Sequence, residues 1–285
     1  MSVNSAAPAR GAILAITSGK GGVGKTSLTV NVAAALARSG HRVGILDADL
    51  GLGNVDVMLG LTPGAHLGDV LGGDKTLSEI VVHAPGDIQV IPAGSGIRAL
   101  TSLNEPQWRR LAEVVAEASA QLDFLLVDTA PGISDHVIGL TALTDRVLVV
   151  TSYEPTAIVD AYAVIKLLSS AHPQREIGVV VNAARDAEQG ELVFRQLSAA
   201  ATRFLGVKLR YYGFIVRDST VAESVLDQRP VVSRVPDAPA SRCFRHLAMR
   251  LTNWSPRRPR ALTPALALPP FSSEEFERLE APRCA

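Results

Sequence analysis

Eight consecutive residues near the N-terminus constrain the fold more than any other part of the chain. They match the pattern G-x-x-x-x-G-K-[ST] and read Gly19, Lys20, Gly21, Gly22, Val23, Gly24, Lys25 and Thr26. Glycines let backbone N–H groups close around phosphate oxygens, the lysine before the threonine reaches the β- and γ-phosphates, and the threonine hydroxyl ligates Mg²⁺. The pattern therefore predicts a triphosphate site, and it leaves Lys20 without a role of its own.

The residues on either side give this loop its structural context. Residues 12–18 form a short apolar run typical of a buried strand, and apolar residues recur with a helical period over 26–39. Gly40 follows where a helix C-cap is expected. Strand, loop and helix thus come in the required order, and the helix N-terminus adds partial positive charge for the phosphates.

Strand-like and helix-like segments alternate from residue 12 to about residue 252. The predicted strands are 12–18, 42–47, 87–92, 124–128, 146–151, 176–182 and 208–216. The predicted helices are 26–39, 105–121, 156–171, 187–205, 218–227 and 239–252. Several of the strands are apolar on both faces, as in a parallel sheet covered by helices. The alternation predicts an α/β fold with a doubly wound, mostly parallel sheet, which binds ligands at the carboxyl ends of its strands.

Polar side chains stand at the ends of several predicted strands. Asp47 and Asp49 end one strand, two residues apart and on the same side of it, and Asp128 ends another apolar strand. An aspartate in such a place holds Mg²⁺ or orients a water, or alternatively caps the following turn. Asn182 also ends a strand, where its amide suits either an adenine edge or a turn, and the chemistry leaves both open.

Composition bounds the remaining possibilities. The chain has 285 residues, enough for one large domain, and its zero formal net charge argues against nucleic acid as a partner. Cys243 and Cys284 form no C-x-x-C pair, as expected for a cytoplasmic protein, and they give no sign of a metal site or a disulfide framework. We expect neither a secretion signal nor a transmembrane helix.

The chain divides into four parts by composition. Residues 1–11 are expected to form a flexible arm and residues 12–254 a P-loop ATPase domain. Residues 255–271 read as a proline-rich linker, and residues 272–285 as an acidic tail with room for a short helix.

Three segments resemble known proteins. Residues 20–26 are similar to the deviant Walker A motif of the MinD/ParA ATPases, and residues 46–61 resemble the next MinD-type block. Residues 154–162 resemble a segment typical of the flagellar-number branch of that family, FlhG (also called FleN). The resemblance covers residues 12 to about 252 and implies a P-loop NTPase fold of the SIMIBI, MinD-like type.

The resemblance assigns the catalytic residues and explains the extra lysine. It implies a homodimer that sandwiches two ATP molecules, in which Lys20 crosses the interface to the partner's phosphates, as an arginine finger does. Lys25 acts in its own subunit, and Asp49 positions the attacking water.

The same resemblance assigns the binding residues. Thr26, Asp47 and Asp128 would hold Mg²⁺, and Ser27 would lie near the α-phosphate. Residues 49–54, ending at Asn54, and residues 128–135 would be the switch loops that sense the γ-phosphate. For Asn182 the resemblance favours the adenine contact.

The chain departs from the family pattern at three places. Ala183 stands where many members have arginine, and Val216 where many have proline, near the adenine. Residues 1–10 lack the glutamine- and arginine-containing segment with which FlhG proteins stimulate the GTPase FlhF. These departures weaken the expected adenine contact through that strand and the expected stimulation of FlhF.

The implied function is a slow, partner-stimulated ATPase switch that regulates flagellar number, placement or gene expression. Its partners would be an FlhF-like GTPase or a flagellar transcription regulator, and it would act in the cytoplasm, at the inner membrane or at the cell pole. A MinD-like division-site regulator, a ParA-like partitioning ATPase and a nucleotide-bound scaffold that restrains a transcription factor are the alternatives.

Membrane association has two candidate segments. Glutamates surround the apolar residues of 272–280 and disfavour an anionic surface. The segment 239–252 has an apolar stripe opposite arginines, which suits either a membrane or a helix packed on the sheet.

Overall fold

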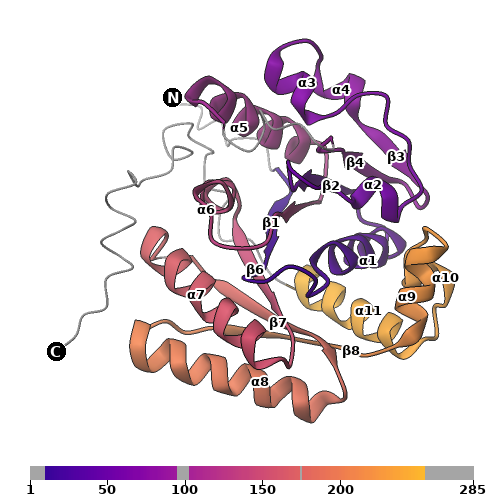
Figure 1. The fold of residues 1–285 in the computed structure, drawn as a ribbon. Helices are drawn as coiled ribbons and strands as arrows, with labels where there is room; N and C mark the ends of the chain where they lie inside the picture. Colours follow the sequence, from indigo (N-terminus) through magenta and orange to yellow (C-terminus); the bar gives the residue numbers. More distant parts are fainter. Residues whose placement is uncertain (1–9, 95–102, 174, 254–285) are drawn as a thin grey trace, which may run out of the picture.

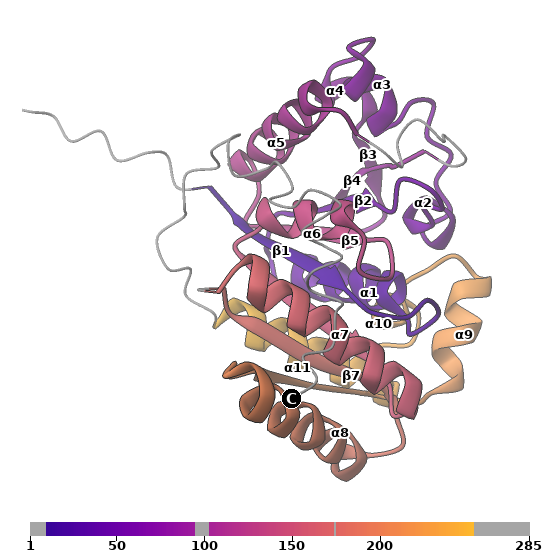
Figure 2. The same ribbon diagram turned by 60° about the vertical axis from the view of Figure 1, so that its left-hand side comes forward.

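One eight-stranded sheet organises the protein. The computed structural model describes residues 10–94, 103–173 and 175–253. The strand order is β3-β4-β2-β5-β1-β6-β7-β8, and helices cover both faces (Figures 1 and 2). All described strand pairs are parallel except β3 with β4. The structure confirms the doubly wound, mostly parallel α/β fold.

The strands follow the apolar runs of the sequence. They are β1 (Ala12–Thr17), β2 (Val43–Ala48), β3 (Val82–Ala84), β4 (Ile88–Ile91), β5 (Phe124–Thr129), β6 (Arg146–Thr151), β7 (Ile177–Ala184) and β8 (Arg210–Val216). Each predicted strand is present, with its ends within two residues of the prediction. Sequence analysis missed β3, because three residues at a sheet edge, of which only Ala84 is buried, give too short a pattern.

Helices connect the strands. They are α1 (Lys25–Arg38), α2 (Val55–Met58), α3 (Leu67–Gly72), α4 (Leu77–Ile80), α5 (Glu105–Ala120), α6 (Asp135–Ala142), α7 (Pro155–Ala171), α8 (Ala187–Ala200), α9 (Ser219–Leu226), α10 (Val231–Arg234) and α11 (Pro239–Thr252). The six predicted helices are present, with one correction. The helix predicted for 187–205 ends as an α-helix at Ala200 and continues as the π-helix η2 (Ala201–Leu205). The short helices α2, α3, α4, α6 and α10 were missed, because four to eight residues show too few helical periods.

The start of α1 differs from the start of α5. Asn104 caps α5 by accepting a hydrogen bond from Gln107 N at 3.0 Å, so that side chains satisfy its first turn. The residue before α1 is Gly24, in the left-handed conformation, and no side chain makes a capping hydrogen bond there. The first N–H groups of α1 are thus left for a ligand.

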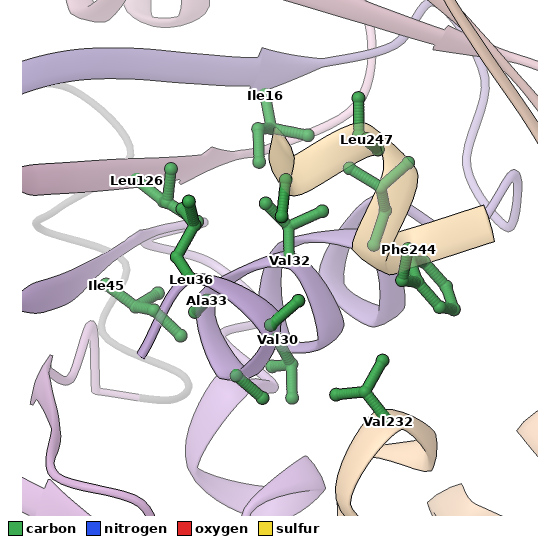
Figure 3. Close-up of a cluster of buried hydrophobic side chains, with 14 of the residues drawn as sticks. Ile16, Val30, Val32, Ala33, Leu36, Ile45, Leu126, Val232, Phe244 and Leu247 are labelled. Carbon is green, nitrogen blue, oxygen red and sulfur yellow. The ribbon is translucent and has the colours of Figure 1, made fainter. Parts of the chain in front are cut away.

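α1 and α11 pack against each other on one face of the sheet. Figure 3 shows Phe244 and Leu247 of α11 beside apolar side chains of α1 and of the strands. Phe244, Leu247 and Leu251 are at most 3% exposed. The apolar stripe of 239–252 is therefore part of the core. Of the two alternatives for this segment, a membrane-binding helix and a helix packed on the sheet, the structure shows the second.

The ends of the described chain are held by specific contacts. Arg10 forms an ion pair with Asp145 at 2.7 Å, and Gly11 N donates to Ser119 O. Arg10 and Gly11, which sequence analysis placed in the arm, thus contact the domain. The rest of that arm, the proline-rich linker and the acidic tail lie outside the described residues. No helix within the described ranges is long and apolar enough to span a membrane.

Candidate nucleotide site

The loop between β1 and α1 lies at the carboxyl edge of the sheet, and close contacts require glycine at two of its positions. Gly24 has a φ of +90°, and a Cβ atom there would lie 2.3 Å from Asn182 Nδ2. A Cβ atom on Gly19 would lie 2.2 Å from the carbonyl oxygen of Asp160 in α7. Neither position admits a side chain without rearrangement, so the loop is pinned between α7 and the end of β7.

Two buried carboxylates face the loop from adjacent strands. Asp47 of β2 and Asp128 of β5 are register partners in the sheet, and each is 1% exposed. Burial raises the pKa of Asp47 to about 7 and that of Asp128 to about 6. Each of two neighbouring buried carboxylates raises the free energy of the other's ionised form, because like charges repel. A cation bound between them would lower that free energy.

Hydrogen bonds hold these carboxylates in place. Asp47 accepts from the backbone N–H groups of Asp49 and Val55 at 3.2 and 3.1 Å. Asp128 accepts from Thr29 Oγ1 at 3.0 Å, and the nearby Thr26 hydroxyl lowers the pKa of Asp128. The predicted Mg²⁺ ligands Thr26, Asp47 and Asp128 therefore meet in one place, with hard oxygen ligands of the kind that Mg²⁺ prefers.

Lys25 supplies the positive charge of this cluster. It is 7% exposed, and burial lowers its pKa, while Asp128 and Asp49 act in the opposite direction. A buried ammonium group in a site with few counter-charges is stabilised by an anion. The position suits the phosphate contact predicted for this lysine.

Polar atoms without a partner provide a test of the fit to a nucleotide. The hydroxyl oxygens of Ser27 and Thr17 are buried and make no hydrogen bond within the described part of the chain. Both residues adjoin the phosphate loop, where the N-terminus of α1 is also uncapped. Buried donors are normally satisfied, so these groups fit a phosphate-bearing ligand with Mg²⁺.

Lys20 lies on the opposite side of the loop from Lys25. Its Nζ contacts Glu154 Oε2 at 2.8 Å and Thr156 Oγ1 at 3.2 Å, at the start of α7. The side chains of the Lys20–Glu154 pair are 39% and 52% exposed. The hydrogen bond to Glu154 is the main cause that raises the pKa of Lys20. The lysine is thus charged, at the surface, and held by its own subunit.

The first predicted switch segment lies at the rim of the site. Asp49 is half-buried and accepts a hydrogen bond from Leu52 N at 3.2 Å. Asn54 is exposed, and its side chain donates to Leu52 O at 2.7 Å, immediately before α2. Asp49 is near enough to Lys25 to influence its titration, whereas Asn54 points into a local turn.

Asn182 lies against the phosphate loop itself. Its Nδ2 donates to Val23 O at 2.7 Å, and the following residue, Ala183, has a φ of +53°. β7 and β8 also shift register over this stretch. The side chain therefore supports the loop in this structure, and the adenine contact stays a prediction.

Two residues that sequence analysis missed belong to the site. Thr29 lies one helical turn after Thr26, on the same face of α1, and that spacing was a usable signal. His136 of α6 packs against Trp108 with ring centroids 5.0 Å apart. Burial lowers the pKa of His136 to about 4, and its Nε2 has no hydrogen-bond partner among the described residues. Nothing in the sequence distinguished it from the other histidines.

Comparisons with known proteins agree with this geometry. The ParA model, described as the NUBPL iron-transfer P-loop NTPase, matches residues 10–252. The chain is 43% identical to the antiactivator FleN of Pseudomonas aeruginosa over 87% of this chain and 89% of FleN. It is 32% identical to the flagellum site-determining protein YlxH of Helicobacter pylori over 76% and 73% of the two chains.

A solved structure shows the same fold. The septum site-determining protein MinD of Pyrococcus horikoshii, complexed with Mg-ADP, superimposes with a TM-score of 0.72 at 25% identity. The match covers 84% of this chain and 95% of that one. With the family model spanning the whole described domain, the chain belongs to the ParA/MinD family of P-loop NTPases.

Proposed function

We propose that this chain is a Mg²⁺-dependent ATPase switch that dimerises with ATP and regulates flagellar number, placement or gene expression through partner proteins. The observation that carries the proposal is the different placement of the two loop lysines. Lys25 is buried beside Asp128, whereas Lys20 is exposed on the other side of the loop. An exposed cation beside a complete phosphate site suits a contact made across a dimer interface.

The chain's own residues divide the work of binding. Lys25 and the backbone of residues 19–24 hold the phosphates, and Ser27 has a free hydroxyl for the same ligand. Thr26, Asp47 and Asp128 hold Mg²⁺, which neutralises phosphate charge when bound. Asp128 and Asp47 must lose their protons for this, so binding is favoured as pH rises towards 8.

Asp49 is proposed to orient the attacking water. It lies two residues beyond the buried Asp47, is half-buried, and belongs to the segment that leads into α2. Its carboxylate accepts a hydrogen bond from Leu52 N at 3.2 Å, a contact within the segment that can be exchanged when the segment rearranges. A rearrangement of the segment between Asp49 and α2 would therefore move the carboxylate that orients the water.

The relatives' names indicate the process that the switch controls. FleN is named an antiactivator and YlxH a flagellum site-determining protein. The first name favours a flagellar transcription regulator as partner, and the second a partner at the site of assembly, such as an FlhF-like GTPase. We propose action in the cytoplasm, with peripheral association at the inner membrane or cell pole through partners.

A MinD-like role in division is the second candidate. MinD of Thermotoga maritima is 35% identical over 60% of this chain, which is less similarity over less of the chain than for FleN. Deleting the gene and counting flagella and septa separates the two roles. Altered flagellar number with normal septa supports the proposal, and misplaced septa with normal flagella contradict it.

The dimer is tested with Lys20→Ala. We expect this variant to bind Mg²⁺–ATP as a monomer but to lose ATP-dependent dimerisation and hydrolysis, as measured by light scattering and phosphate release. Lys208→Ala, which removes an exposed lysine elsewhere, is the matched control and should behave as wild type. Unchanged dimerisation and hydrolysis in Lys20→Ala would rule out the role of this lysine across the interface.

A further inference from the structure

A groove of about 530 Å³ lies along the free edge of the sheet, and one end of it reaches Val216, at the strand end where an adenine contact is expected. β8 forms its floor, α11 one wall, and the start of α8 the other wall. Figure 1 shows β8 running between these two helices. Tyr211 and Gly213 line the floor, and Arg242, His246 and Arg250 line the α11 wall. Apart from Val216, no residue that the proposed ATPase uses lines this groove.

The floor of the groove is a strand with backbone left unpaired. Among the described strands β8 pairs only with β7. Gly213 has a φ of +116°, and the nearest atom to a Cβ there would be Arg250 Nη1, at 3.8 Å. Arg250 Nη1 also donates to Tyr211 O at 3.3 Å, so a flexible side chain covers one acceptor of the edge. A strand edge of this kind readily accepts an extended peptide.

The α11 wall is basic. α11 carries three arginines and one histidine and has no acidic residue. Arg242, His246 and Arg250 are spaced by four residues, which places them on one exposed face. Arg242 and Arg250 bond only to backbone carbonyls of Asp237 and Tyr211, and neither forms an ion pair within the described ranges.

The other wall carries two carboxylates, which limits the possible orientations of a ligand. Asp186 is already paired with Arg185 at 2.8 Å and caps α8 through Gln189 N. Glu191 is exposed and lines the groove. An acidic ligand would therefore place its carboxylates against α11. In addition, the Tyr211 hydroxyl is buried without a hydrogen-bond partner among the described residues.

We propose that this groove binds the chain's own acidic segment, residues 271–280. That segment reads Phe-Ser-Ser-Glu-Glu-Phe-Glu-Arg-Leu-Glu, with four glutamates, one arginine and interspersed apolar residues. Its charge complements the unpaired arginines of α11, and its two phenylalanines suit a groove floored by tyrosine. It is the most acidic stretch of the chain, and it follows α11 after the proline-rich linker.

The linker between α11 and the acidic segment is long enough for the segment to reach this groove. Seventeen residues separate Asn253, at the end of α11, from Phe271, the first residue of the segment. A proline-rich chain of that length extends by at most about 3.1 Å per residue, roughly 53 Å in all, whereas α11 is about 21 Å long. The segment can therefore fold back along the helix that precedes it. Such a tether gives an effective concentration on the order of millimolar, so even weak contacts keep the groove occupied.

The two native cysteines provide a direct test. Cys243 lines the groove and Cys284 follows the acidic segment by four residues, and the chain has no other cysteine. Mild oxidation of the full chain with diamide should form a disulfide within one molecule at least ~10-fold faster than in urea, where only the tether brings the thiols together. Non-reducing electrophoresis and peptide mass mapping identify the product, and Cys284→Ser should abolish it.

Charge reversal tests the recognition itself. Arg242→Glu/Arg250→Glu should slow the reaction several-fold, and adding Glu275→Arg/Glu277→Arg to the same chain should restore it. Arg38→Glu/Arg229→Glu, which reverses two exposed arginines outside the groove, is the matched control. Circular dichroism verifies that each variant is folded.

Three results would overturn the proposal. The first is a disulfide rate that is equal in the wild type, in Arg242→Glu/Arg250→Glu and in urea. The second is a disulfide formed only between two molecules, which would assign the groove to the tail of a second copy. The third is a rate that does not fall between 50 and 500 mM NaCl, since a contact made by exposed charges is screened by salt.

Discussion

The phosphate loop has two sides that differ in almost every physical respect. On the inner side, Lys25, Asp47 and Asp128 are buried, and burial shifts the pKa of all three. On the outer side, Lys20 and Glu154 form an exposed pair. The inner groups are too buried to contact a second protein chain, whereas the outer pair can exchange its partner at little cost because water screens it.

This difference gives the two lysines of the phosphate loop separate roles: Lys25 in nucleotide binding and Lys20 in assembly with a partner. Buried charges without full compensation make the inner side depend on a ligand, because nucleotide and Mg²⁺ supply what the protein leaves unsatisfied. An exposed ion pair makes the outer side responsive, because a partner's phosphates compete with Glu154 for Lys20. We expect substitutions on the inner side to affect binding and stability strongly, and those on the outer side to affect assembly.

The largest effect is expected for Lys25→Ala. The substitution removes the buried cation that faces the phosphates, and we expect Mg²⁺–ATP affinity to fall by at least ~100-fold, about 2.7 kcal/mol. Titration calorimetry measures the affinity, and circular dichroism checks the fold. Lys208→Ala is the matched control and should bind normally. A loss smaller than tenfold in Lys25→Ala would show that the buried side is not where the phosphates bind.

An intermediate effect is expected for Asp47→Asn, on stability and its dependence on pH. The folded-state pKa of Asp47, about 7, lies above that of an unfolded aspartate, so the folded chain binds more protons between pH 4 and 7. The stability of the nucleotide-free protein should therefore fall as pH rises through this range. Asp47→Asn removes this contribution and should stabilise the chain at pH 8 by roughly 2 to 4 kcal/mol.

Urea unfolding at pH 5, 6, 7 and 8, without nucleotide or Mg²⁺, measures this prediction. Asp237→Asn, at an exposed position, should keep the wild-type slope. If the stability of Asp47→Asn depended on pH as much as that of the wild type, or if the variant were less stable at pH 8, the raised pKa of buried Asp47 would not be the cause of the pH dependence.

The smallest effect is expected for Glu154→Gln. The variant weakens the bond that keeps Lys20 on its own subunit, while leaving the inner side intact. ATP affinity and stability should stay within error of wild type, and ATP-dependent dimerisation should occur at a few-fold lower protein concentration. Sedimentation at several concentrations detects the shift. Weaker dimerisation would instead show that Glu154 contributes to the dimer. A changed ATP affinity would show that the exposed Lys20–Glu154 pair also takes part in nucleotide binding.

Local patterns were sufficient for most of the fold. The apolar runs and helical periods placed seven strands and six helices close to their observed ends, because long buried elements carry many consistent residues. β3 and the short helices were missed because their residues take structure from neighbours rather than from a pattern of their own. The change from α-helix to π-helix at Ala201 also has no local signature in the sequence.

The chain's sequence alone determined the phosphate loop and the residue types around it. G-x-x-x-x-G-K-[ST] between a strand and a helix, and aspartates after apolar strands, are local facts that need no partner to be recognised. Only the tertiary structure decided how these groups meet. It aligned Asp47 with Asp128 across β2 and β5, placed Asn182 against Val23, and put Lys20 beside Glu154. These contacts join residues 81 to 159 positions apart, and such distances are set by how the sheet is assembled.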